Sequence, residues 1–160
     1  MQTYKPLAVV FLLLAACAAP TTTLRFHEQV SEALPEGRVR TVDVPGSHQR
    51  IAVDPFAQLN ERDVSEARLE PTPGGQAVRL RFDAHGAHKL GELTTRMRGQ
   101  FLVVFVNDRP VAAVLVDKRI LNGEFLLEAD MADDEEQKLV DGLNKLAGRR
   151  RDFGDTRFAP

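Results

Sequence analysis

The 160-residue sequence contains one cysteine, no tryptophan and one tyrosine, and its aromatic share is 6%. A single cysteine cannot form an internal disulfide or a multi-thiolate zinc site, which excludes disulfide scaffolds and cysteine-based zinc folds. The sequence also lacks an excess of basic residues, since 21 Lys and Arg stand against 23 Asp and Glu. Binding of nucleic acid needs a basic face, so we expect no nucleic-acid partner.

Long hydrophobic runs are absent except at the N-terminus. Leu7 to Ala19 is apolar, interrupted only by Cys17, and one cation, Lys5, precedes it. The run is shorter than the roughly 20 residues that a membrane-spanning helix needs. It has the form of a secretory signal peptide.

The only cysteine stands at the end of this run, in the sequence Leu14-Ala15-Ala16-Cys17. This tetrapeptide resembles the lipobox of bacterial lipoproteins, in which the peptidase cleaves before the cysteine and the thiol carries a diacylglyceryl group. We expect cleavage between Ala16 and Cys17, and a lipid on Cys17 that anchors the protein to an envelope membrane, facing the periplasm. An ordinary signal peptide with an Ala-x-Ala site is the alternative. By resemblance to enterobacterial sorting, Ala18 favours the outer membrane.

The length fits one folded domain. We expect a signal peptide at 1–16, a lipidated cysteine and flexible tether at 17–24, a single domain at 25–148, and a basic flexible tail at 149–160.

Helical periodicity predicts a short N-terminal helix from the spacing of Phe26, Val30, Ala33 and Leu34. Two longer helices follow later in the chain. The first has Asp83 as N-cap, reaches about Met97 and stops at Gly99; the second begins at Asp133, has Glu136 in an acidic capping box and ends at Gly148.

Strands are predicted where apolar residues alternate or run unbroken between turn residues. The unbroken runs Phe101–Val106 and Val111–Val116 are expected to form a hairpin of central strands. The other predicted strands are Val39–Val44 paired with Gln49–Val53, Glu66–Glu70, Ala77–Phe82 after the turn at 71–75, and Glu124–Glu128. These elements predict an α+β fold, with the two longer helices packed on one face of a mainly antiparallel sheet.

From about Ile51 to Ala147 the order of elements resembles the head subdomain of the first periplasmic domain of SecD, the export accessory that works with SecF. The matching positions are scattered along the chain. They are Asn60–Ala67, Val78–Gly86, Leu93-Thr94, Gly99-Gln100, Phe101–Val106, Asp108, Val111, Ile120, Gly123 and Phe125.

The resemblance implies a periplasmic head of a kind that contacts polypeptide emerging from the translocon. Met97, Val114 and Gly91 depart from the residues that the family usually has at these positions. Nothing in the sequence corresponds to the membrane-spanning, proton-driven part of SecD, so that activity is not implied.

Catalytic and metal-binding motifs are sparse. Asp83, His85 and His88 are weak metal candidates, because positions two and five residues after Asp83 splay around a helix. No serine stands in a Gly-x-Ser-x-Gly context, and the pair Gly74-Gly75 joins strands without opening a helix. We therefore expect no catalytic residues and no cofactor.

The sequence favours a non-enzymatic binding or accessory module that contacts polypeptide or another envelope protein. A guest strand added to an exposed sheet edge is the expected mode, with Thr41 and Arg68 as weak candidate positions. A small hydrolase or metal-dependent enzyme assembled from distant residues, and a structural subunit of an envelope assembly, are the alternatives.

Overall fold

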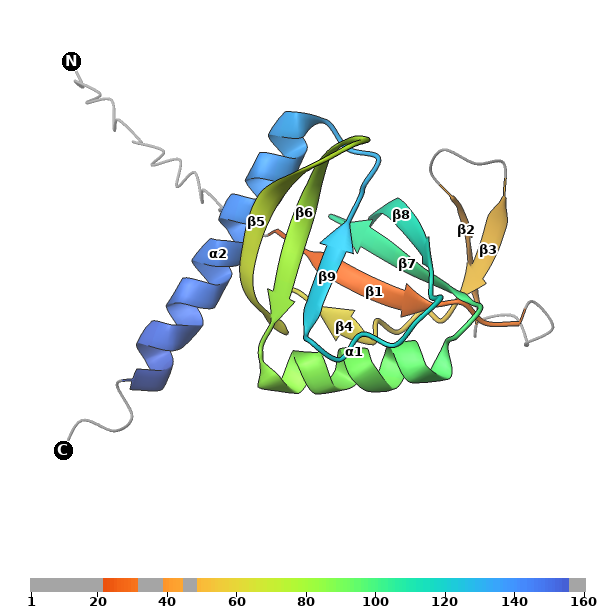
Figure 1. The fold of residues 1–160 in the computed structure, drawn as a ribbon, viewed down its shortest axis with the longest axis horizontal. Coiled ribbons are helices and arrows are strands. Elements are labelled where there is room, and N and C mark those ends of the chain that lie inside the picture. Colours follow the sequence, from red (N-terminus) through yellow and green to blue (C-terminus); the bar gives the residue numbers. More distant parts are fainter. Residues whose placement is uncertain (1–21, 32–38, 45–48, 156–160) are drawn as a thin grey trace, which may run out of the picture.

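The computed structural model describes residues 22–31, 39–44 and 49–155. The predicted signal peptide, Cys17 and most of the tether lie outside the described residues. The described chain folds into antiparallel strands and two long helices (Figure 1), which confirms the predicted α+β class.

The largest sheet has the strand order β4-β1-β7-β8. Its strands are β1 (Leu24–Glu28), β4 (Leu59–Asn60), β7 (Phe101–Val106) and β8 (Arg109–Leu115), and every neighbouring pair is antiparallel. Asn107 and Asp108 join β7 to β8 with positive φ angles of 49° and 62°. Such angles are typical of the tight two-residue turns that match the twist of a hairpin.

A second sheet has the order β5-β6-β9, from β5 (Val64–Thr72), β6 (Gly75–Phe82) and β9 (Glu124–Leu127). Its strands confirm the predicted turn at 71–75 and the strands around it. A two-stranded sheet pairs β2 (Arg40–Asp43) with β3 (Arg50–Val53), as the sequence predicts. The predicted single sheet is therefore divided into three among the described residues.

Helix α1 (Ala84–Arg96) begins as predicted, because the Asp83 carboxylate accepts the N–H of Gly86 at 2.8 Å. Gly86 also lets the helix approach the turn before β5. A Cβ added there would lie 2.7 Å from the backbone oxygen of Asp63. The structure thus explains both Asp83 and Gly86, which stand in a segment that resembles the SecD head.

Helix α2 (Asp133–Asp155) does not end at Gly148, as predicted, but continues seven residues further. Among the described residues, nothing lies within 4 Å of a Cβ added at Gly148, so this glycine is not required by a close contact within that part of the chain. The capping also differs from the prediction: Ala132 donates its N–H to Glu135 at 3.3 Å. Glu136 turns inward, where Gln76 donates to its carboxylate at 3.2 Å.

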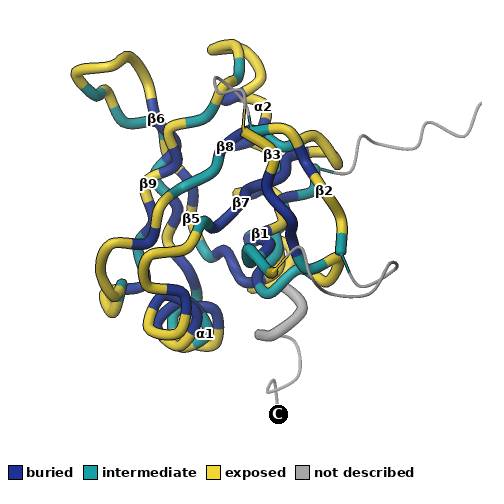
Figure 2. Tube along the Cα trace, turned by 90° about the vertical axis from the view of Figure 1, so that its right-hand side faces the viewer, coloured by how far each residue is buried: buried dark blue, intermediate teal, exposed yellow. Residues whose placement is uncertain are grey.

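The main core fills the space between the two larger sheets and both long helices, and Figure 2 shows strands β1 and β7 among the buried parts of the chain. Both helices contact β6; α2 also packs along β5, and α1 against β4. A smaller apolar cluster joins the β2–β3 hairpin to the other face of β7, through Val42, Ile51, Val53, Val103 and Phe105.

Two predictions about individual elements are wrong. The spacing of Phe26 and Val30 predicted a helix, but Leu24–Glu28 forms strand β1, in which buried Leu24 and Phe26 alternate with exposed Arg25. Pairing with β7 on one side and β4 on the other decides in favour of the strand. Strand β8, predicted to be central, is at the edge of its sheet.

Candidate functional site

Large apolar side chains are exposed at few places in the described chain. These are Phe56 at 77%, Leu121 at 68%, Leu115 at 51% and Leu126 at 38% of their full exposure. The three leucines line one hollow of about 530 Å³, formed by the end of β8, the following loop and β9. Exposed apolar groups that gather in one place indicate a binding surface more strongly than scattered ones do.

A second hollow of about 460 Å³ continues along β8. It lies between Val44, which follows β2, and Leu126 on β9, with residues 111–114 of β8 as its floor. The two hollows share Val114 and Leu126, so they adjoin. We call them together the β8 groove.

The floor of the β8 groove is an open strand edge. Val116 donates its N–H to Gln100 and accepts from Gly99, so its backbone groups point towards β7. Backbone groups of successive residues in an antiparallel strand point to opposite sides. The N–H and C=O groups of Ala113 and Leu115 therefore point away from β7, and no hydrogen bond reaches them from the described residues.

The facing edge of β9 is open in the same way. Phe82 donates to the carbonyl of Gly123, which places the backbone groups of Leu126 on the side away from β6. At one end, Asp130 donates its N–H to the carbonyl of Val111 at 2.8 Å, and within the described ranges this is the backbone hydrogen bond that links the two sides of the groove. This hydrogen bond closes one end of the β8 groove.

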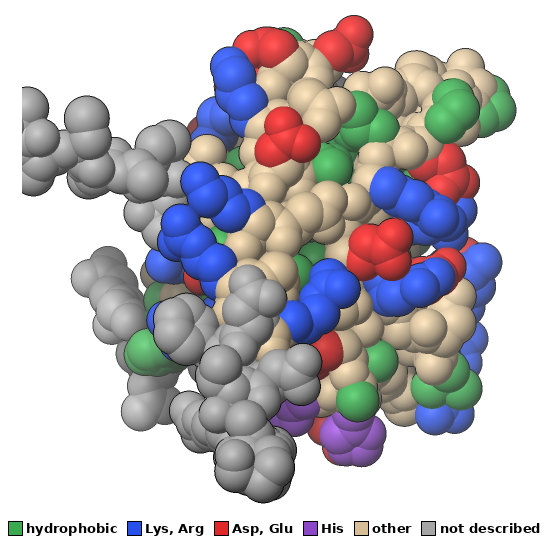
Figure 3. All heavy atoms as spheres, turned by 90° about the vertical axis from the view of Figure 1, so that its left-hand side faces the viewer, with side chains coloured by type: hydrophobic (Ala, Val, Ile, Leu, Met, Phe, Trp, Pro, Cys, Tyr) green, Lys and Arg blue, Asp and Glu red, His purple; other side chains and the backbone are tan. Residues whose placement is uncertain are grey.

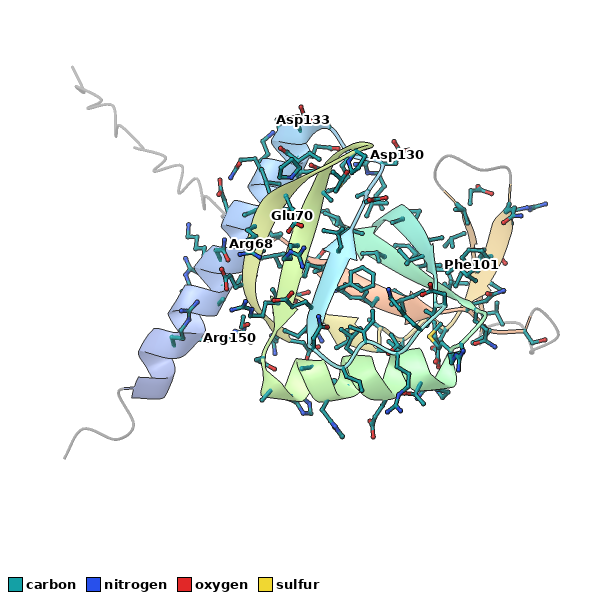
Figure 4. All side chains as sticks on the ribbon, viewed as in Figure 1. Arg68, Glu70, Phe101, Asp130, Asp133 and Arg150 are labelled. Atoms are coloured by element: carbon teal, nitrogen blue, oxygen red, sulfur yellow. The ribbon has the colours of Figure 1, made fainter. Side chains whose placement is uncertain are left out.

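Charge differs between the two ends of the groove. Glu128 and Asp130 lie at the closed end, and Asp130 is seen beyond the tip of β9 in Figure 4. Asp117, Lys118 and Arg119 lie in the loop at the other end, where two cations outnumber one anion. None of these five side chains forms an ion pair within the described part of the chain.

An ion-pair network covers the adjoining face of the β5-β6-β9 sheet. Arg79 lies between Glu70 and Glu124, and Arg81 contacts Glu66 and Glu124. The hydrogen bond from Arg79 lowers the pKa of Glu70, and the bond from Arg81 lowers the pKa of Glu124. Arg79 and Glu124 of this network also line the first hollow, so charged side chains border the apolar surface of the groove.

Strand β5, a predicted docking edge, is already covered. Asn144 of α2 accepts from the N–H of Ala67 and donates to its carbonyl. Because the backbone of Ala67 points outward, that of Arg68 points towards β6, even though its side chain is exposed (Figure 4). A guest strand cannot use Arg68. Thr41 does lie on the outer side of β2, because Val44 donates its N–H to Gln49, and alternation then turns the backbone groups of Val42 towards β3 and those of Thr41 away from it.

The weak metal candidates are not brought together. Asp83 caps α1 and lies 3.5 Å from Arg150, while His88 lies 3.4 Å from Glu92 and His85 is exposed. Within the described ranges, no group of three or more His, Cys, Asp or Glu side chains is arranged to hold a metal ion. Ala16 and Cys17 lie outside those ranges.

The β8 groove was missed because periodicity cannot separate an apolar edge strand from a central one. Val111–Val116 is apolar throughout, which predicted cover on both faces. Leu126, by contrast, stands between Phe125 and Leu127, so that three large apolar residues follow one another in a short strand. Such a run has more large apolar residues than one buried face of a strand needs. This excess was the signal in the sequence for an exposed apolar surface.

The fold and the groove define a small antiparallel α+β domain whose exposed apolar side chains collect along an open strand edge. Residues 31–145 match the family model of the SecDF P1 head subdomain, so the chain belongs to this family. The match confirms the resemblance inferred from the sequence. It begins at residue 31, earlier in the chain than Ile51, where the inferred resemblance begins.

Two solved structures have the same fold. One, of SecDF in a super-membrane-facing form, superposes with a TM-score of 0.60 at 20% identity, over 78% of this chain and 19% of that chain. The other, of a membrane component SecDF that enhances protein export, gives a TM-score of 0.59 at 19% identity, over 78% of this chain and 62% of that one. This chain thus spans only part of both.

No curated protein matches the sequence. Among the described residues, neither long helix is apolar enough over a sufficient length to cross a membrane. The side of the molecule that carries α2 shows Lys and Arg side chains together with Asp and Glu (Figure 3), in keeping with the balanced composition.

Proposed function

We propose that the protein is a non-enzymatic accessory module of the bacterial cell envelope, which binds extended segments of polypeptide in the β8 groove. The observation that carries this proposal is the position of Leu115, Leu121 and Leu126 around an unpaired strand edge. An unfolded polypeptide offers both apolar side chains and free backbone groups, so it complements both features of the groove.

Membership of the SecDF P1 head family supports this function. One structural neighbour is described as a membrane component that enhances protein export. This chain corresponds to 62% of that chain and to 19% of the other neighbour. For this chain we therefore propose only contact with polypeptides during export, and no other activity of those larger proteins.

The proposed anchor is a lipid on Cys17, with the domain in the periplasm and the outer membrane as the favoured site. Thr22 lies against α2, where a Cβ added at Gly142 would overlap its side chain. Thr23 donates to Asn107 and accepts from it. Only five residue steps separate Cys17 from Thr22, an extended reach of about 17 Å.

Such a short tether would hold the domain next to the membrane, with Thr22 and the Asn107 turn nearest to it. Confinement raises the local concentration of the groove towards polypeptides that cross or leave that membrane. Weak individual contacts are then sufficient for binding.

Photocrosslinking in intact cells tests the groove. A photoreactive amino acid placed at Leu126 should crosslink to exported polypeptides of many sizes. Phe56 provides the matched control, because its exposed apolar side chain lies outside the groove. Equal crosslinking from the two positions, or none from Leu126, would overturn the proposal.

A separate experiment tests the anchor. Cys17→Ser should abolish fatty-acid labelling and release the exported protein from the membrane fraction. A wild-type protein whose N-terminal residue carries no acyl mass would exclude the lipid.

A further inference from the structure

Strand β8 lies at the bottom of a slot that has apolar walls on both sides. Ala113 and Val44 both pack against the smaller apolar cluster, on the side of the β2–β3 hairpin, and both line the groove. Val114 packs with the main core and borders the groove together with Leu126, on the side of β9. Both faces of a strand placed in this slot would therefore meet apolar side chains.

We propose that an extended polypeptide segment binds by adding a strand to β8, antiparallel to it, through the backbone groups of Ala113 and Leu115. This inference rests on the proposed function and specifies its binding mode and the chemistry of the bound segment. The guest strand would extend the β4-β1-β7-β8 sheet by one strand.

The available backbone groups set the length of the guest. Ala113 and Leu115 each present one N–H and one C=O, at a spacing of about 7 Å along the strand. The hydrogen bond from Asp130 to Val111 blocks further pairing at one end. The paired part of the guest is therefore about four residues long and leaves the slot towards the loop at 117–122.

The walls set the composition of the guest. Alternate side chains of a strand point to opposite faces, and in this slot both faces are apolar. The preferred guest thus has consecutive apolar residues, unlike the alternating pattern of a half-exposed strand. Such runs are buried in folded proteins, so the slot would select chains that have not folded.

With antiparallel pairing, the charges at the two ends of the groove set where the guest carries its own charged residues. Glu128 and Asp130 lie at the closed end and form no ion pair with described residues. A guest antiparallel to β8 places the residues after its apolar run at this end. Lys or Arg following the run is then favoured, and acidic residues preceding the run are favoured near Lys118 and Arg119.

Proline substitution tests the strand pairing. Ala113→Pro removes an outward N–H without affecting the bonds to β7, so the fold should persist, as for other prolines on edge strands. Binding of a labelled peptide with about four apolar residues followed by two lysines is measured by fluorescence anisotropy, with the full chain in neutral-lipid nanodiscs. Ala113→Pro should weaken binding about fivefold, the value of one hydrogen bond.

Thr41→Pro is the matched control, because it removes an outward N–H from the edge of the β2–β3 hairpin instead. Strand addition to β8 requires unchanged peptide binding in this variant; a loss of binding in Thr41→Pro and none in Ala113→Pro would place the guest strand on the β2 edge instead. Should Ala113→Pro fail to fold, wild-type protein is used with peptides N-methylated at successive positions. Strand pairing requires that methylation weakens binding at alternate positions only.

The outcomes separate this inference from the proposed function. Loss of binding in Leu126→Glu, with no effect of Ala113→Pro or of N-methylation, would leave a polypeptide-binding groove and overturn strand addition. A peptide whose lysines follow the apolar run should bind more tightly than a peptide whose lysines precede it. The reverse order of affinities would overturn the antiparallel direction. Absence of any peptide binding would overturn both proposals.

Discussion

The side chain of Asn144 takes the place of a neighbouring strand for Ala67. Its amide oxygen accepts the N–H of Ala67 at 2.9 Å, and its amide nitrogen donates to the carbonyl of Ala67 at 2.8 Å. Arg150 and Arg151 donate to two further carbonyls of β5, those of Val64 and Ser65. Helix α2 thereby closes an edge that would otherwise compete with β8 for guest strands.

Asn144→Ala should lower the free energy of unfolding by about 1–3 kcal/mol, because the buried backbone of Ala67 loses both partners. Urea unfolding measures the change. Lys145→Ala is the control, since Lys145 is exposed on the same helix and should matter by less than about 0.5 kcal/mol. Equal stability of the two variants would show that water replaces Asn144 without cost.

Truncation after Gly148 should lower the melting temperature by a few degrees. The deletion removes Arg150, which donates to Val64 and lies 3.5 Å from Asp83, and Arg151, which donates to Ser65 at 3.2 Å. A loss of about 1 kcal/mol shifts the melting temperature of a domain this size by about 2–6 °C. Truncation after Asp155 keeps these contacts and should melt as the full chain does.

The continuation of α2 illustrates what could be predicted from the sequence. Both long helices begin where expected, because the signals for their starts are local in the sequence. These signals are the N-cap Asp83 and the apolar stripes of the two helices, and Gly99 follows the first helix as predicted. Gly148 carries the same local signal as a helix end, but arginine contacts with β5 outweigh it. These contacts join residues 86 positions apart, which no local pattern contains.

The position of β1 has the same explanation. Phe26 and Val30 fit a helical face, and only the registered pairing of β1 with β7 makes the strand more stable. The β8 groove depends on which strand ends its sheet, and strand order is a property of the whole fold. Of the predicted edge positions, Thr41 does lie on a free side, whereas Arg68 does not.

A pair of glycines in α2 tests the placement of the N-terminal segment. Gly148→Ala should stabilise the protein by about 0.5–1 kcal/mol, because the helix gains a better helix former in open space. Gly142→Ala brings the same helical gain but displaces Thr22, so it should not stabilise. Equal stabilisation in urea unfolding would place Thr22 away from α2. Thr22→Gly should restore the gain in the Gly142→Ala background.

The buried ring of His27 predicts a dependence of stability on pH. Burial lowers the pKa of His27, nearby Arg40 and Arg25 lower it further, and the hydrogen bond of 2.7 Å to the carbonyl of Asp54 opposes them. The unfolded chain binds a proton at the ordinary pKa of 6.5, above the pKa in the folded state. The contribution of the neutral His27 ring to the free energy of unfolding is thus fully present above pH 6.5 and is lost as the pH falls below 6.5.

We expect the urea concentration at the unfolding midpoint to decrease as the pH is lowered from about 7.5 to about 5. This pH range lies above the titration of the paired carboxylates. The ring of His27 contacts that of Phe105 at 4.8 Å between centroids, and Phe105 also packs under the β2–β3 hairpin. Protonation should therefore loosen the hairpin first, which hydrogen exchange of the paired residues Val42 and Ile51 can detect. His27→Gln should remove the slope, while His88→Gln, at an exposed histidine, should retain it. A slope that persists in His27→Gln would assign the pH dependence to another group.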